Sequence, residues 1–375
     1  PAVAGELVLG VAHGLGRDAV LLFIASLLSV SGRCRVVLFV DAPIPEAELR
    51  AEGVDTGRIH FETVQLPLPL PWDQCHIDSS RYRIYQNYML RINVAKDYRV
   101  VLLAHPDDVA FQADPFEWMA KEERSKKPGV HVFSDEPGRT IGADFAARHL
   151  VQHAFGPEEV AKISGELLLP AGVVIGTTAD MVRYVDEMCT LITTRPPSVC
   201  HSRGADQVIH DVLIRRSLKA GPGQSSAFQV ITHDNRNGPV WNGGFVPVSS
   251  VSLDSENMVI NEDGFRYVAL HQYVEHDSLW KHLSSRFLKT RMQRLQKMDA
   301  GCTGFAVSSG DIRGFDLSHT PADVEEDCCK ACLLDKACHS FIFSQGRKHC
   351  WLKRPGGTVI PVHAGDDMRV GELKK

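Results

Sequence analysis

The sequence predicts an α/β protein with a mainly parallel sheet covered by helices on both faces, followed by a small disulfide-rich α+β domain. Its 375 residues exceed the usual size of one domain. Short, almost continuously apolar segments alternate with helical patterns along most of the chain, as buried parallel strands require. Six of the 10 cysteines follow residue 300, so the C-terminal segment is predicted to be a separate unit.

The first part of the chain alternates predicted strands with helices. An apolar run at residues 7–12 predicts the first strand, and Asp18 can cap a helix that continues to Leu28. Similar runs predict three more strands, which we place at residues 35–40, 59–64 and 99–104. A helix at residues 81–97 precedes the last of these strands, and it carries mixed aromatic and basic side chains.

The second part continues the pattern. Further strands are predicted at residues 130–134, 172–175 and 267–270, and helices at residues 181–192, from 206 onward, and at 278–298. The last helix is basic, and we expect it to join a first domain at residues 1–276 to a tail domain at 301–375, within a linker at 277–300. We place Trp241 in a loop, where it could stack on a sugar or pack into the core.

Composition excludes some classes of function. The formal net charge of −5 disfavours a protein that coats nucleic acid. The longest apolar run, at residues 19–28, contains Ser26 and is too short to span a bilayer. Because the chain begins with Pro1, we expect a fragment from which a targeting segment has been lost. The Gly14-x-Gly16 turn lacks the third glycine and the ribose-binding acid of a dinucleotide site.

A polar cluster follows the predicted strand at residues 99–104. His105, Asp107 and Asp108 stand where ligands bind in open parallel sheets, outside the carboxyl end of a strand. Carboxylates and an imidazole can hold Mn²⁺, and carboxylates alone suit Mg²⁺. A cation there would neutralise a diphosphate and stabilise its departure. A solvated turn with a capping Asp is the alternative.

Four motifs carry a resemblance to a known family. The segment at residues 101–116 resembles the donor site of nucleotide-sugar glycosyltransferases with a GT-A-like fold, in particular the plant and algal cell-wall type. The stretches at 170–176, 204–207 and 271–276 resemble later motifs of that family, in the same order, so the similarity spans roughly residues 6–285. Two positions depart from the pattern, because His105 replaces an Asp and Pro170 replaces an Asn.

The resemblance implies a GT-A-like, Rossmann-like catalytic domain that transfers a sugar from a nucleoside diphosphate, most simply UDP, to a protein or polysaccharide acceptor. It implies no nucleic-acid partner. The residues expected to contact the donor are Ala12, His13, Arg81, Tyr82, His105, Asp107 and Asp108. The residues expected to hold Mn²⁺ or Mg²⁺ are His105, Asp107, Asp108 and His271. The residues expected beside the acceptor, one of them a candidate base, are Asp206 and Gln207.

Other interpretations of these residues stay open. The segment from Ala104 to Asp108 also resembles the zinc motif of sugar N-deacetylases, although Val109 stands where that family has a Glu. A transferase-like fold that only binds glycans is a third possibility. Each single residue has a structural alternative: Arg81 could form an ion pair, Asp206 could cap a helix, and His271 could be a hydrogen-bonded core histidine.

The cysteine-rich tail resembles a PAN/apple module over residues 302–372. Its helix cysteines, a Cys-x-x-Phe-x-Phe strand and a Cys-Trp-Leu-Lys strand carry that similarity. The resemblance implies the pairs Cys328–Cys350 and Cys332–Cys338, and leaves Cys302–Cys329 as the third. A zinc knuckle is the alternative. Modules of this type bind proteins or glycans, and the disulfides imply the secretory pathway, either the Golgi lumen behind a lost N-terminal anchor or secretion.

Overall fold

The computed structural model describes residues 5–125, 127–219, 228–288, 305–335, 337–356, 358–360 and 367–373. The chain divides into two compact units, Pro1–Phe287 and Leu288–Lys375. Helix α11 (Asp277–Phe287), the first part of the predicted linker, belongs to the first unit, where it contacts α1 (Arg17–Val30). The rest of the helix predicted to reach Met298 lies outside the described residues.

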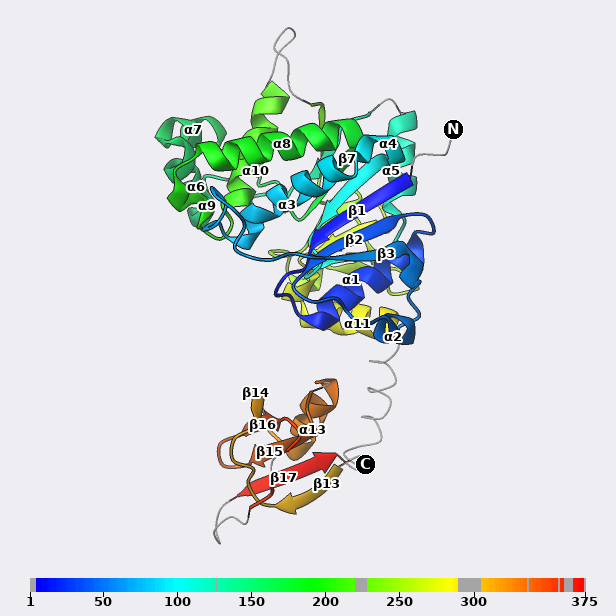
Figure 1. The fold of residues 1–375 in the computed structure, drawn as a ribbon, viewed down its shortest axis with the longest axis vertical. Coiled ribbons are helices and arrows are strands. Elements are labelled where there is room, and N and C mark those ends of the chain that lie inside the picture. The colour runs from blue at the N-terminus through cyan, green and yellow to red at the C-terminus, as the bar shows by residue number, and fades with distance from the viewer. Residues whose placement is uncertain are drawn as a thin grey trace. The chain divides into compact units, whose positions relative to one another are not determined.

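A seven-stranded mixed sheet forms the centre of the first unit (Figure 1). Its strands, in spatial order, are β3 (Ile59–Thr63), β2 (Arg35–Val40), β1 (Gly5–Val11), β4 (Tyr98–Ala104), β7 (Val173–Thr177), β6 (Val130–Phe133) and β8 (Val230–His233). The first four are mutually parallel, and so are β6 and β8. Strand β7 runs antiparallel to both of its neighbours, so the sheet is mainly but not wholly parallel.

Helices cover both faces of this sheet, as predicted (Figure 1). Helices α3 (Ile77–Arg91), α8 (Thr178–Thr194) and α10 (Ala205–Lys219) pack together on one face, over the buried side chains of Leu7 and Leu9. Helix α1 covers the other face. It begins after Gly16, so Asp18 lies in its first turn rather than at its cap. Burial of these two apolar faces supplies most of the driving force for folding.

The helix predicted at residues 81–97 is two helices. Helix α3 begins four residues earlier than Arg81, and the backbone of Asn93 then adopts a left-handed conformation with φ of 51°. Asparagine tolerates this conformation better than most residues, and the turn separates α3 from α4 (Val94–Asp97). The remaining short helices of the first unit are α2 (Glu46–Ala51), α5 (Pro115–Arg124), α6 (Phe145–Phe155), α7 (Pro157–Ile163) and α9 (Pro197–Cys200).

A second, three-stranded sheet lies next to the end of β4. Strand β12 (Ala269–His271) pairs antiparallel with β5 (Val109–Phe111) and parallel with β9 (Val240–Asn242). Trp241 is therefore in a strand, not in the predicted loop, and it is only 4% exposed. A two-stranded ribbon of β10 (Ser252–Leu253) and β11 (Val259–Ile260) completes the first unit.

A disulfide within the first unit joins two segments far apart in the sequence. Cys75 pairs with Cys200 across 125 residues, and the backbone N–H of His76 donates to the carbonyl of Cys200 at 2.8 Å. The bridge ties the start of α3 to the end of α9. The sequence pattern gave no reason to pair these two cysteines.

Removing this bridge is expected to destabilise the first unit by about 2–4 kcal/mol, because the cross-link restricts the unfolded chain. The double variant Cys75→Ser/Cys200→Ser tests this by denaturant unfolding of the full chain. Cys189→Ala is the control, since Cys189 is a buried free cysteine of the same unit. An equal loss of stability in both variants would show that packing, not the cross-link, is responsible.

The second unit is a five-stranded antiparallel sheet with one helix. The strand order is β13 (Phe305–Ser309), β17 (Met368–Leu373), β15 (Ser340–Ser344), β16 (His349–Lys353) and β14 (Asp316–Pro321), and α13 (Glu325–Leu334) packs on β15 and β16. The predicted bridges Cys328–Cys350 and Cys332–Cys338 are both present. Cys329 is also disulfide-bonded, and its predicted partner, Cys302, lies outside the described residues. These bridges replace the alternative zinc knuckle.

None of the helices in the described part of the chain has the length and apolar character needed to cross a bilayer.

Candidate functional site

The turn between β4 and β5 is the centre of the candidate site. Its backbone is held from two sides: the N–H of His105 donates to the carbonyl of Gly172 at 3.0 Å, and the carbonyl of Asp108 accepts from the N–H of Gln272 at 2.8 Å. A Cβ atom on Gly10, near the end of β1, would lie 2.7 Å from the ring of Pro106. The ends of β1 and β4 therefore meet at one edge of the sheet.

Three potential cation ligands converge in this turn, as predicted. One ligand atom from each of His105, Asp107 and Asp108 lies within 4.8 Å of the others. Burial, followed by the charge of Asp108, raises the pKa of Asp107 to about 6. Burial, followed by the charge of Arg81, lowers the pKa of His105 to about 3, so this imidazole is neutral at physiological pH and can act as a ligand.

His271 reaches the same cluster from β12. Its Nε2 lies 3.5 Å from Oδ2 of Asp108, and its side chain is only 4% exposed. Burial alone would raise the pKa of Asp108, but the charge and hydrogen bond of His271, together with other nearby charges such as that of Arg81, lower that pKa. The other carboxylate oxygen, Oδ1, is buried and has no hydrogen-bond partner among the described residues. An unpartnered buried carboxylate oxygen is an incomplete arrangement that a cation would complete.

Asn242 fixes the orientation of the His271 ring. Its Nδ2 donates to the carbonyls of Phe133 and Ser134 at 3.3 and 2.8 Å, so its Oδ1 must face His271, whose Nδ1 lies 2.7 Å away. Because a carbonyl oxygen only accepts, Nδ1 donates to Asn242, and Nε2 is the ring nitrogen that faces Oδ2 of Asp108. Metal-binding histidines are commonly oriented by such an acceptor behind the ring.

Gly172 makes room for this histidine. A Cβ atom at position 172 would overlap Nε2 of His271. Gly172→Ala is therefore expected to displace the ring and to lower stability by about 1–3 kcal/mol, measured by denaturant unfolding. The matched control is Gly165→Ala, since no atom lies within 4 Å of a Cβ there. Equal stability of the two alanine variants would contradict the tight packing of Gly172 against His271.

Arg81 and Asp206 form a buried ion pair behind the cluster. Nη2 of Arg81 lies 2.7 Å from Oδ2 of Asp206, and the two side chains are 4% and 6% exposed. The same nitrogen donates to the carbonyl of Ala171 at 3.2 Å. Burial raises the pKa of Asp206, and the charge of Arg81 opposes this effect. The pair connects α3 and α10 to the segment that leads into Gly172.

Two predicted site residues serve the packing of this region. Tyr82 is 1% exposed; its hydroxyl accepts from Nη2 of Arg81 at 3.1 Å and lies 3.3 Å from that of Tyr184, so it belongs to the core that supports the Arg81–Asp206 pair. Gln207 accepts from the N–H of Ala171 at 2.8 Å and donates to the carbonyl of Leu169 at 2.7 Å. It also donates to Asp211 at 2.9 Å. The side-chain amide of Gln207 thus holds the segment before β7 in place.

The predicted nucleotide contacts Ala12 and His13 follow β1 at the same edge of the sheet. Ala12 is 4% exposed, and its N–H donates to the carbonyl of Phe39 at 2.7 Å. The N–H of Gly14 lies 3.4 Å from Oδ1 of Asp41, the residue after β2. This turn is thus fixed to the neighbouring strand, and His13 stands partly exposed beside it.

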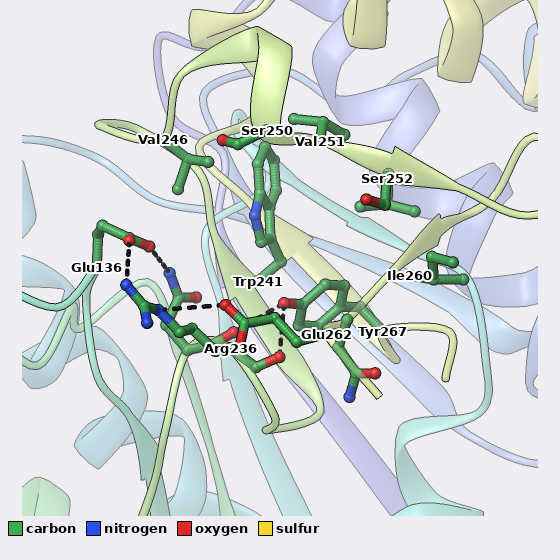
Figure 2. A pocket seen from close by; sticks show the side chains of 13 residues that line it. Glu136, Arg236, Trp241, Val246, Ser250, Val251, Ser252, Ile260, Glu262 and Tyr267 are labelled. Atoms are coloured by element: carbon green, nitrogen blue, oxygen red, sulfur yellow. Dashed lines mark hydrogen bonds and ion pairs between the residues drawn. The ribbon is translucent and has the colours of Figure 1, made fainter. Parts of the chain in front are cut away.

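A pocket of about 220 Å³ adjoins the small sheet. Figure 2 shows Trp241 and Tyr267 beside the paired side chains of Glu136 and Arg236, whose ion pair measures 3.4 Å. The pocket and the cluster share β9, because Trp241 lines the pocket while the next residue, Asn242, bonds His271. A mixed polar and aromatic lining of this kind suits a sugar.

The structure thus brings together most of the predicted residues at one sheet edge. Sequence reasoning missed the function of Asn242, which was assigned to a loop, and of Asp211, which accepts from the N–H of Leu169 at 2.9 Å. Neither residue stands in a motif that indicates a role. Gly172 did lie within a recognised motif, but its contact with His271 joins residues 99 positions apart and needs the fold to become visible.

Comparison with known proteins identifies the second unit only. The family model of the PAN domain matches residues 305–353, which confirms the predicted C-terminal module. A search of curated proteins finds no match. A PAN domain and disulfide bonds fit an extracellular or secretory protein.

Proposed function

We propose that the first unit is a GT-A-like glycosyltransferase that moves a sugar from a nucleoside diphosphate, most simply UDP, to a protein or polysaccharide acceptor. The observation that carries the proposal is the convergence of Asp107, Asp108, His105 and His271 at the carboxyl end of β4. In open α/β sheets, ligands bind at this edge. The mixed sheet with helices on both faces is consistent with such a fold.

The donor set fits a divalent cation such as Mn²⁺. Asp108 offers a buried oxygen without a hydrogen-bond partner among the described residues, and Nε2 of His271 lies 3.5 Å from its other carboxylate oxygen. Asp107 and the neutral His105 complete a set of carboxylate and imidazole ligands, which Mn²⁺ accepts. When bound, the cation would neutralise the two phosphates of the donor and stabilise the departing nucleoside diphosphate.

The protein's own groups have separate tasks in this proposal. The turns after β1 and β4 bind the donor between them, since Gly10 and Pro106 bring these turns into contact. The Arg81–Asp206 pair fixes the carbonyl of Ala171 and thereby positions the segment that leads into Gly172. Asp206 is deeply buried, so we assign it to positioning this segment rather than to proton transfer from the acceptor. Much of catalysis would then come from orientation of the two substrates.

The PAN domain would act as a binding module for the acceptor glycan or glycoprotein. A hollow of about 510 Å³ on this unit is lined by Trp351, Arg347, Arg313 and Asp311 among others. An aromatic ring beside charged and hydrogen-bonding groups is suited to carbohydrate or peptide recognition. The PAN domain and the disulfides support a location in the secretory pathway, and we propose the Golgi lumen or secretion.

A donor panel tests the function. The full chain is incubated with individual UDP-sugars and a mixed glycan acceptor, with and without Mn²⁺, and release of UDP is measured. The expected result is release with one donor, increased by Mn²⁺ and lost on chelation. Zinc-dependent release of acetate from an N-acetylated glycan would instead identify a sugar N-deacetylase, because His105 and the two aspartates can also hold zinc. Glycan binding without turnover would identify a binding protein.

A further inference from the structure

A second group of metal-binding side chains lies under helix α5, on residues that the proposed function does not use. Glu122 comes from α5, His131 from β6 and His233 from the end of β8. One ligand atom from each lies within 4.8 Å of the others. The Trp118 ring stands edge-on to both imidazoles, with ring centroids 5.2 Å apart in each case, and limits how far the imidazoles can turn.

The hydrogen bonds of His131 leave one nitrogen for a ligand. Its Nε2 lies 3.1 Å from the carbonyl of Lys127, which only accepts, so Nε2 carries the proton. Burial lowers the pKa of His131 to about 4, and the neutral ring therefore has a lone pair at Nδ1. That lone pair faces Nε2 of His233 at 2.8 Å. A backbone carbonyl behind a histidine is a frequent partner of metal-bound imidazoles.

The histidine pair is neutral on both sides. Burial also lowers the pKa of His233, to about 3, with the neighbouring His131 adding to the effect. Without an ion, Nε2–H of His233 donates to Nδ1 of His131 at 2.8 Å. A cation would take the place of this proton: His233 would then carry its proton on Nδ1, and the two facing nitrogens would both offer lone pairs to the ion.

Glu122 supplies the negative charge of the group. Its Oε2 is buried and has no hydrogen-bond partner among the described residues, and Nζ of Lys127 is 3.7 Å away. Two imidazoles and one carboxylate are a common zinc ligand set, with water as the fourth ligand. Two atoms bound to one zinc ion lie roughly 3.3 Å apart, since each bond is about 2.0–2.1 Å. Small side-chain rotations would therefore bring the three ligand atoms to bonding distance from a single ion.

We propose that Glu122, His131 and His233 bind a zinc ion. The ion would fasten α5 to β6 and to the edge strand β8. This site is independent of the proposed transferase activity, because it uses none of the residues of the cluster at the end of β4.

Zinc binding to the metal-free full chain tests the proposal. The background carries Asp107→Asn and Asp108→Asn, which removes the carboxylates of the other cluster. We expect one zinc ion per chain in a chelator competition, and the visible absorption of a four-coordinate ion when Co²⁺ replaces zinc. His233→Ala and the nearly isosteric Glu122→Gln, each added to this background, are expected to weaken zinc binding by roughly 100-fold.

The control is His153→Ala, which removes an exposed histidine bonded to Ser198. This control should bind zinc like the background protein. Zinc should also raise the unfolding temperature of the background protein and leave that of Glu122→Gln unchanged. The proposal is overturned if the background protein binds no zinc, or if His233→Ala and Glu122→Gln both keep its zinc affinity and its cobalt spectrum. Neither result bears on UDP release by the unaltered chain.

Discussion

Asp108→Asn is expected to reduce the rate of UDP release from the productive donor by roughly 100- to 1,000-fold, the usual effect of losing one preorganised charge at a reacting centre. Asparagine keeps the shape of the side chain but removes the negative charge that faces His271 at 3.5 Å. It also replaces one carboxylate oxygen by a nitrogen that cannot bind a cation. Steady-state assays with saturating Mn²⁺ measure the change.

The matched control for this charge change is Glu275→Gln. Glu275 is exposed in the short helix after β12, four residues beyond His271, so the control alters net charge equally without touching the cluster. Its activity should equal that of the unaltered chain. Retention of activity in Asp108→Asn, with a normal unfolding temperature, would exclude the carboxylate of Asp108 from the reaction.

Arg81→Met is expected to lower the free energy of unfolding by about 3–5 kcal/mol, since it leaves the carboxylate of Asp206 buried without its partner. It also removes the hydrogen bond to the carbonyl of Ala171. Denaturant unfolding of the full chain, followed by circular dichroism, measures the loss. The effect should be large because both side chains are almost fully buried.

The double variant Arg81→Met/Asp206→Leu separates charge from packing. Replacing both partners by apolar side chains should recover much of the lost stability, because no uncompensated charge remains. Arg50→Ala removes an exposed ion pair with Glu46 and should leave the unfolding midpoint unchanged. If the double variant is less stable than Arg81→Met, the buried pair contributes more through its hydrogen bonds than through its charges.

Six of the seven strands of the main sheet were predicted, while the short β8 was not, because its side chains are half-buried or exposed and form no long apolar run. Runs such as residues 35–40 and 99–104 are buried on both faces and read as continuous apolar segments, so their positions were right within about two residues. The direction of β7 was not predictable, because a short buried strand looks the same in either orientation. Its antiparallel course depends on the path of residues 134–172, where α6 and α7 lie.

The candidate site was partly predictable for a similar reason. Asp107 and Asp108 were identifiable because two acidic residues directly after an apolar strand indicate a ligand site at the edge of the sheet. Asn242 and Gly172 act on His271 from other elements, and only the three-dimensional arrangement reveals that they meet. Tyr82 was expected at the donor together with Arg81, but the fold places its hydroxyl in the core, between Nη2 of Arg81 and the hydroxyl of Tyr184.

The bridge between Cys75 and Cys200 lies close in sequence to both members of the buried ion pair, six residues before Arg81 and six before Asp206. If the chain is produced in a reducing bacterial cytoplasm, the Cys75–Cys200 bridge does not form, and the starts of α3 and α10 lose this nearby cross-link. This loss affects the first unit even if the PAN domain is not needed for turnover. Production of the protein in an oxidising host, or refolding with a thiol–disulfide buffer, is therefore a condition for any assay of the larger unit.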